Sequence, residues 1–165
     1  MLSKLVDFFW RVYSHFKTIE IKFFYHRHVY LKGKEYFRPY FKIVYAGGSL
    51  TIGEKCFFNS GCKITMMGQV VIGSNCLFGE NVRIYDHNHR FASKELISKQ
   101  GMSIGKVTIG NNCWIGTNAI ILKGANIGNH CVIGAGCVIS GDIPDNTIVK
   151  FSNSSIVTMP IENKG

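Results

Sequence analysis

An isoleucine at every sixth position dominates the second half of this 165-residue chain. A small residue follows four positions after five of these isoleucines, and glycine follows directly after four of them. The isoleucines are Ile109, Ile115, Ile121, Ile127, Ile133 and Ile139, and the small residues are Cys113, Ala119, Ala125, Cys131 and Cys137. The same unit occurs earlier, from Ile52 to Ile64 and, after a slip of two residues, from Ile72 to Ile84.

A repeat of six residues matches neither the 3.6-residue period of a helix nor the alternation of a strand. It fits short strands joined by tight corners, in which three hexads make one triangular turn. The apolar residue of each hexad stacks inward and the small residue fills the inside of a corner. Glycine permits backbone angles there that other residues resist. The sequence therefore predicts an all-β solenoid, a parallel β-helix over residues 46–165.

The composition fits a single domain with one appended element. No cysteines form a CxxC pair, and each stands at the small corner position of a hexad, so we interpret them as small buried residues. They are Cys56, Cys62, Cys76, Cys113, Cys131 and Cys137. The N-terminus lacks the pattern of a signal peptide, and no apolar run is long enough to cross a membrane. We expect a cytoplasmic protein with free thiols.

The repeat is interrupted at YDHNH, residues 85–89. The hexad register ends at Ile84 and returns at Ile109, so residues 88–106 are expected to leave the coil as a polar loop. His87 stands at the root of that loop, where a neutral imidazole can take a proton at physiological pH. Its second ring nitrogen could be held by Asp86 or by a backbone carbonyl. We favour the carbonyl, because adjacent side chains of a strand point to opposite faces.

The stretch VTIGNNCWIGTNAIILKGANIGNHCVIGAGCVISGDIPDN, residues 107–146, resembles the hexapeptide-repeat acyltransferases, whose fold is a left-handed parallel β-helix. The motifs DHNH and QGMSIGKVTIGNNCWIG are most similar to those of the polysaccharide and capsule O-acetyltransferases. The resemblance implies transfer of an acetyl group from acetyl-CoA to a hydroxyl of a sugar or polysaccharide precursor. It also implies a homotrimer with active sites at the subunit seams.

The same resemblance assigns roles residue by residue. It makes His87 the general base, with His89 as the alternative. The predicted contacts with coenzyme A are Trp114, Thr117, Ala135, Ser140 and Lys150. The assignment of Lys150 departs from the family, which continues with GxPAK or GxPxR where this chain reads KFSNSS. The predicted contacts with the acceptor are Tyr85, Asp86 and His89.

Two other functions stay open. The KFSNSS departure is compatible with a non-catalytic hexapeptide scaffold that has lost coenzyme A binding. The fold also hosts γ-class carbonic anhydrases, whose zinc site includes an H-x4-H pair. Here His87 and His89 are two residues apart and His130 lies on a distant turn, so we expect no metal.

Residues 1–45 carry nine Lys and Arg against three Asp and Glu, whereas residues 46–165 carry ten against seven. Apolar residues at steps of three and four, from Leu2 to Phe23, predict a helix with one apolar face. Such a basic appendage could lie on the inner face of a membrane as a peripheral anchor. It could instead cover the open end of the first coil. No recognised nucleic-acid motif accompanies the charge, so we do not expect nucleic acid as a partner.

Overall fold

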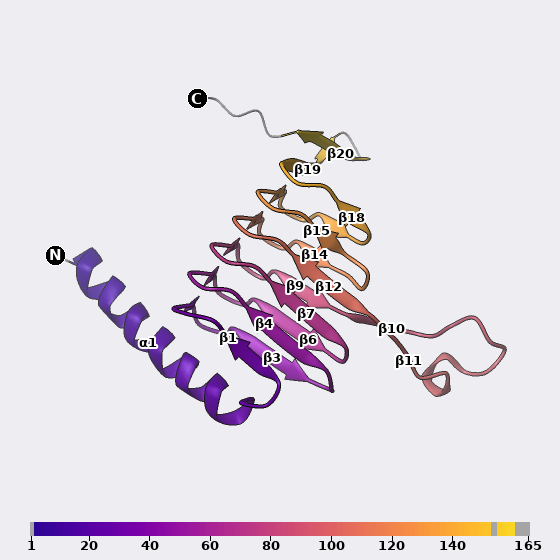
Figure 1. The fold of residues 1–165 in the computed structure, drawn as a ribbon, viewed down its shortest axis with the longest axis horizontal. Coiled ribbons are helices and arrows are strands. Elements are labelled where there is room, and N and C mark those ends of the chain that lie inside the picture. Colours follow the sequence, from indigo (N-terminus) through magenta and orange to yellow (C-terminus); the bar gives the residue numbers. More distant parts are fainter. Residues whose placement is uncertain (1, 153–154, 161–165) are drawn as a thin grey trace.

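The computed structural model describes residues 2–152 and 155–160 (Figure 1). They form a parallel β-helix of about six turns, and one helix, α1 (Leu2–Phe24), lies against its N-terminal end. The solenoid and the N-terminal helix predicted from the sequence are therefore confirmed.

Each full turn of the coil adds one strand to each of three parallel sheets, here named A, B and C. Sheet A contains β1 (Val29–Leu31), β4 (Ser49–Ile52), β7 (Gln69–Ile72), β12 (Lys106–Ile109), β15 (Asn126–Ile127) and β18 (Asp142–Ile143). Sheet B contains β2 (Tyr36–Phe37), β5 (Phe57–Phe58), β8 (Leu77–Phe78), β13 (Trp114–Ile115), β16 (Val132–Ile133), β19 (Thr147–Ser152) and the antiparallel β20 (Ser155–Pro160). Sheet C contains β3 (Lys42–Tyr45), β6 (Lys63–Met66), β9 (Arg83–Tyr85), β14 (Ile120–Ile121) and β17 (Val138–Ile139). We call the edges where these sheets meet AB, BC and CA, in chain order.

The isoleucines of the repeat point inward and stack in register. Ile109 aligns with Ile127 in sheet A, and Ile115 aligns with Ile133 in sheet B. Their side chains are almost completely buried in one continuous core. Burial of a side chain of this size contributes about 1.5–3 kcal/mol, so the stacked rungs are the main source of stability.

The coil begins earlier than the sequence predicted, at Val29 rather than at Ala46. Strand β1 pairs in parallel with β4, and β2 and β3 pair with β5 and β6. This first turn lacks the full signature of the repeat, because Glu35 and Phe41 stand where later turns have small corner residues. Its inward residue in sheet B is also aromatic, and the Phe37 and Phe58 rings stack with centroids 5.4 Å apart.

Helix α1 covers the open end of this first turn. Ile21 is buried against the coil, and the Ser14 hydroxyl accepts a hydrogen bond from the Phe37 amide at 3.0 Å. The same hydroxyl donates to the Glu35 carbonyl at 3.2 Å. The helix therefore forms hydrogen bonds with polar backbone groups of the first coil that would otherwise lack protein partners.

The corners explain the cysteines and the asparagines. Each corner thiol is buried, and those of Cys56, Cys76 and Cys113 donate to a carbonyl of the next turn at 3.0–3.1 Å. Left-handed backbone at the AB edge is supplied mostly by asparagine, which tolerates it better than most residues. His130 occupies one of these left-handed positions, with φ of 55°, and its Nδ1 lies 2.9 Å from Asn146 Oδ1. It is a corner residue of the repeat.

The excursion that follows β9 is a β-hairpin. Strands β10 (His87–His89) and β11 (Met102–Ile104) pair in antiparallel fashion, and a short 3-10 helix, η1 (Ile97–Lys99), lies near the tip. The coil resumes at once with β12, in register with β7. The hairpin projects from the CA edge, away from the body of the solenoid (Figure 1).

Candidate active site

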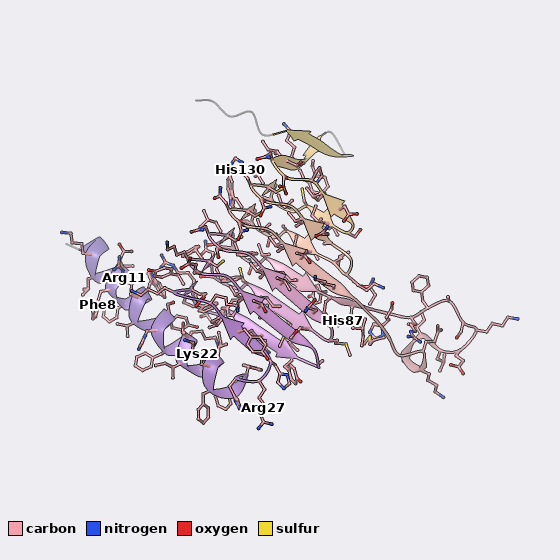
Figure 2. The ribbon with its side chains drawn as sticks, viewed as in Figure 1. Phe8, Arg11, Lys22, Arg27, His87 and His130 are labelled. Atoms are coloured by element: carbon pink, nitrogen blue, oxygen red, sulfur yellow. The ribbon has the colours of Figure 1, made fainter. Side chains whose placement is uncertain are left out.

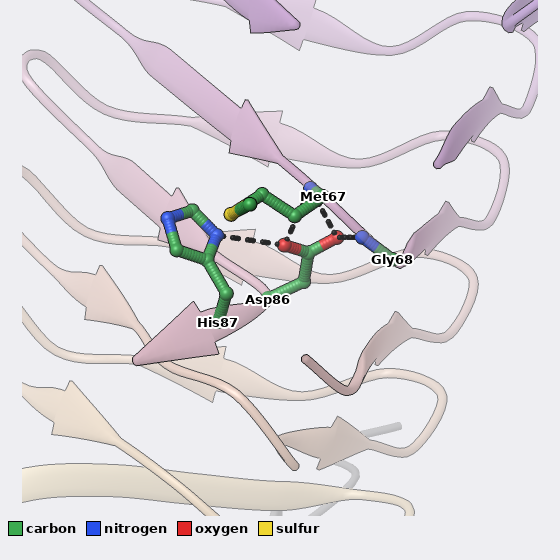
Figure 3. A network of polar contacts seen from close by, with 4 residues as sticks. All are labelled: Met67, Gly68, Asp86 and His87. Carbon is green, nitrogen blue, oxygen red and sulfur yellow. Dashed lines mark hydrogen bonds and ion pairs between the residues drawn. The ribbon is translucent and has the colours of Figure 1, made fainter. Parts of the chain in front are cut away.

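Asp86 is the first residue of the excursion and is completely buried. Its carboxylate accepts hydrogen bonds from the backbone amides of Met67 (2.9 and 3.2 Å) and Gly68 (2.8 Å), which form the CA corner one turn earlier (Figure 3). These two residues lie where the repeat slips between Ile64 and Ile72. A buried carboxylate needs such donors, and this irregular corner supplies them.

His87 is held by the same carboxylate. Its Nδ1 lies 3.0 Å from Asp86 Oδ1, and 14% of its side chain is exposed. An ionised carboxylate only accepts hydrogen bonds, so Nδ1 carries the proton and Nε2 keeps a free lone pair. In Figure 3 the second ring nitrogen lies on the side of the ring away from Asp86. Our prediction of a backbone carbonyl as the orienting group is therefore wrong.

The burial of Asp86 also corrects its predicted contact with the acceptor. Both of its oxygens face the Met67–Gly68 corner and His87, so the carboxylate orients the His87 ring instead. The adjacent side chains can meet because the chain leaves the coil between them: Asp86 turns inward while His87 begins the hairpin.

The other two predicted acceptor contacts flank His87. Tyr85 is half-buried, and its ring lies edge-on to the His87 ring with centroids 6.4 Å apart. His89 is exposed and, two residues along β10, lies on the same face of the hairpin as His87.

A cavity of about 530 Å³ lies against the hairpin and is lined by His89, Arg90, Phe91 and Lys123, among others. Sequence reasoning missed Lys123, which donates a hydrogen bond to the Ser103 hydroxyl at 2.7 Å. Lys123 follows Ile121 by two residues, as Asp86 follows Ile84, and these isoleucines align in sheet C. Stacking the hexads in sequence would therefore have placed Lys123 directly above Asp86.

Three of the predicted coenzyme A contacts stack on the BC edge. Thr117 and Ala135 are three hexads apart and occupy the same corner in successive turns, where the Gly136 amide donates to the Thr117 carbonyl at 2.9 Å. Lys150 lies one turn further along, beside Gly134. Trp114 lies on the outer face of sheet B between Leu77 and Val132, and 56% of it is exposed.

The single chain does not bring these residues to His87. Thr117 and Ala135 belong to the BC edge and His87 to the CA edge, so the width of sheet C separates them. One side of the coil is about one hexad wide, and six residues of extended chain span at most about 20 Å. Ser140 is exposed and shares the CA edge with His87, two turns beyond Tyr85 in sheet C.

In the described part of the chain, no group of three or more His, Cys, Asp or Glu side chains could hold a metal ion. Within the same residues, no helix is both long and apolar enough to cross a membrane.

Two segments match models of repeat families. Residues 106–141 match the bacterial transferase hexapeptide (six repeats), and residues 69–84 match the hexapeptide repeat of succinyl-transferase. The chain is a hexapeptide-repeat protein. The resemblance found in the sequence is thereby confirmed.

Curated relatives of this hexapeptide-repeat protein include acetyltransferases. The galactoside O-acetyltransferase of Lactococcus lactis is 30% identical over 128 residues, which cover 78% of this chain and 61% of that one. A Schizosaccharomyces pombe protein described as a candidate acetyltransferase is 37% identical over 103 residues, covering 62% of this chain and 49% of that one. The chain thus spans about half to three-fifths of the length of these relatives.

Solved structures of the same class superpose well. A maltose O-acetyltransferase from Clostridium difficile 630 is 29% identical with a TM-score of 0.72, covering 84% of this chain and 73% of that one. A galactoside acetyltransferase in complex with coenzyme A is also 29% identical with a TM-score of 0.72, covering 81% and 66%. A hexapeptide-repeat acetyltransferase from Vibrio cholerae, at 24% identity and a TM-score of 0.70, shares the fold and covers 81% and 72%.

Proposed function

We propose that the chain is an acetyltransferase that moves the acetyl group of acetyl-CoA to a hydroxyl of a sugar or of a polysaccharide precursor. The observation that carries this proposal is the Asp86–His87 pair, a buried carboxylate bonded to a partly exposed imidazole at the root of a hairpin. The galactoside and maltose O-acetyltransferases among the similar proteins support the same reaction and acceptor class.

In the proposed reaction His87 acts as the general base. Its Nε2 takes the proton of the acceptor hydroxyl while that oxygen attacks the thioester carbonyl carbon of acetyl-CoA. The carbon–sulfur bond then breaks, and the departing thiolate of coenzyme A recovers the proton from the imidazolium. Asp86 holds Nδ1 protonated throughout and stabilises the positive charge that forms on the ring.

The acyl donor is proposed to lie along the BC edge, where Thr117 and Ala135 stack and Lys150 can meet a phosphate. Trp114 is the proposed contact for the thioester arm. Because His87 lies on a different edge, we propose a homotrimer in which the CA edge of one chain faces the BC edge of its neighbour. A solenoid with flat faces can pack side by side around a three-fold axis in this way.

The acceptor is proposed to lie between His87 and the cavity beside the hairpin, with Tyr85 and His89 as contacts. Arg90 and Lys123 line that cavity together with Glu95, so two basic side chains face one acidic side chain there. We also propose that the protein attaches peripherally to a membrane, on its cytoplasmic side.

The test uses two variants that are inactive for different reasons. His87→Ala removes the base, and Ala135→Trp fills the proposed coenzyme A corner from an exposed position. Release of the coenzyme A thiol is measured with galactosides, maltose and maltose oligosaccharides as acceptors. We expect His87→Ala to lower turnover by about 10²-fold or more with little change in coenzyme A affinity.

Co-expression of the two variants then tests the seam. If each site takes its base from one chain and its coenzyme A groove from the next, random mixing restores activity at about a quarter of the seams. No recovery would mean that both groups come from one chain. Near-normal turnover in His87→Ala with loss in His89→Ala would move the base to His89. Failure of the wild-type protein to bind coenzyme A by calorimetry would contradict the proposed activity itself.

A further inference from the structure

Helix α1 presents one face to the coil. Trp10, Ser14, Lys17 and Ile21 follow one another at steps of three and four, and all four are buried or half-buried. The guanidinium of Arg38 lies 5.0 Å from the centre of the Trp10 ring, which further ties the helix to the first turn. This face closes the end of the solenoid, as described above.

The opposite face of α1 is apolar and open. Phe8, Val12, Phe16, Ile19 and Phe23 also follow at steps of three and four, so they form a second stripe. Phe8, Phe16 and Phe23 are 59%, 66% and 73% exposed. Large apolar side chains gathered in this way on one exposed surface mark an interaction site.

A third line along the helix is basic. Lys4, Arg11 and Lys22 are spaced by seven and eleven residues, so they share one side of α1, and all three are exposed. Arg27 continues the positive charge beyond the helix, where Figure 2 shows it pointing away from the coil. The acidic Glu20 is offset by Lys17, whose Nζ lies 2.8 Å from its carboxylate.

We propose that this outer face of α1 docks on the surface of an anionic lipid bilayer. Aromatic and aliphatic side chains with a basic flank match the boundary between acyl chains and negatively charged headgroups. A second copy of the chain fits the surface less well, because it would bring another segment with nine basic and three acidic residues to the same place. One face of α1 thus closes the end of the solenoid, and the opposite face binds the membrane.

This pose fixes the height of the proposed active site, a consequence that rests on the proposed function. Strand β9, which precedes His87, lies two turns beyond β3 of the first coil. Two strand spacings contribute about 10 Å, and the diameter of α1 adds about another 10 Å. His87 therefore stands on the order of 20 Å above the outer face of the helix. This height suits a glycan that is anchored to lipid and projects from the membrane.

Co-sedimentation with vesicles tests the docking without any measurement of activity. The full chain is compared with Phe8→Ser/Phe16→Ser, with Lys4→Gln/Arg11→Gln, and with Phe91→Ser as a matched control. Phe91 is 75% exposed but lies on the hairpin. Vesicles contain phosphatidylglycerol in phosphatidylcholine, or phosphatidylcholine alone, and light scattering gives the mass of each protein free of lipid.

We expect the wild type and Phe91→Ser to bind the phosphatidylglycerol vesicles and to detach at high salt. The double phenylalanine variant should bind at least about tenfold more weakly, and each lost charge should cost about fivefold. Equal binding to both lipids, or full binding by Phe8→Ser/Phe16→Ser, would overturn the proposal. A smaller mass for that variant, with no lipid binding by the wild type, would assign the face to contact between protein chains. Either failure leaves the proposed acetyl transfer untouched.

Discussion

The BC and CA edges of the solenoid differ in how regular the lengths of their corners are. Every corner on the BC edge contains four residues, as in 38–41, 59–62 and 134–137. Corners on the CA edge range from the short link 67–68 to the whole excursion between β9 and β12, residues 86–105. The regular edge carries buried thiols and left-handed asparagines, whereas the irregular edge carries Asp86, His87 and the hairpin.

The contrast shows where a repetitive fold can host chemistry. A regular corner satisfies its own backbone groups turn after turn, which leaves few polar groups for other purposes. The irregular corner at Met67–Gly68 presents two amides, and their acceptor is the carboxylate that also orients His87. The same carboxylate therefore satisfies the amides of the irregular corner and orients the His87 ring.

The strongest test of this contrast compares two aspartates that each accept from a backbone amide of the preceding turn. Asp86 is buried on the CA edge, whereas Asp145 is exposed on the AB edge and bonds the Asn129 amide at 2.7 Å. We expect Asp86→Ala to lower the free energy of unfolding by about 3 kcal/mol, because two buried amides lose a charged acceptor. It should also lower acetyl transfer by about 10²-fold.

Asp145→Ala is the matched control. Water can replace the exposed carboxylate, so we expect a loss under about 1 kcal/mol and unchanged acetyl transfer. Urea unfolding and the acceptor assay measure both quantities. Equal losses for the two variants would show that the irregular edge has no special role.

A smaller effect is expected on the regular edge, at Cys62. Burial raises the pKa of this thiol from 9.0 to about 11. Between these values the folded chain keeps a proton that the unfolded chain releases, so stability is intact below pH 9 and falls as pH rises toward 11. The slope is about 1.4 kcal/mol per pH unit for one such thiol.

Cys62→Val removes this titration and places in the corner the residue type that Val82 supplies one turn later. Unfolding free energies at pH 8 and pH 10 should then differ by less in Cys62→Val than in the wild type. An unchanged difference would mean that the Cys62 thiol is not buried as described.

The regular parts of this molecule could be predicted from the sequence because each rung repeats the same residue types. The isoleucines from Ile109 to Ile139 predicted the turns of the coil, and the end of the register at Ile84 predicted where the chain leaves it. The first turn could not be found in this way, because Glu35 and Phe41 stand where the later turns have small corner residues.

The candidate site could be predicted only in part. His87 was predicted from its place at the break in the repeat and from the family motif. Its contact with Asp86 was one of two alternatives and was not the favoured one, because adjacent side chains of a continuous strand diverge. The break between coil and hairpin has no signature of its own in the sequence. The contact of Lys123 with Ser103 depends on the return strand β11 passing beside the coil where it joins β12, which only the three-dimensional structure reveals.

The protonation of the His87 ring is the most direct test of the account. Nitrogen NMR of the imidazole groups, assigned with His87→Gln, identifies which ring nitrogen carries the proton in the neutral form. The structure predicts the proton on Nδ1, donated to Asp86, with Nε2 free to take the proton of an acceptor hydroxyl. A proton on Nε2 would contradict this account, because the nitrogen that points away from Asp86 could then not act as the base.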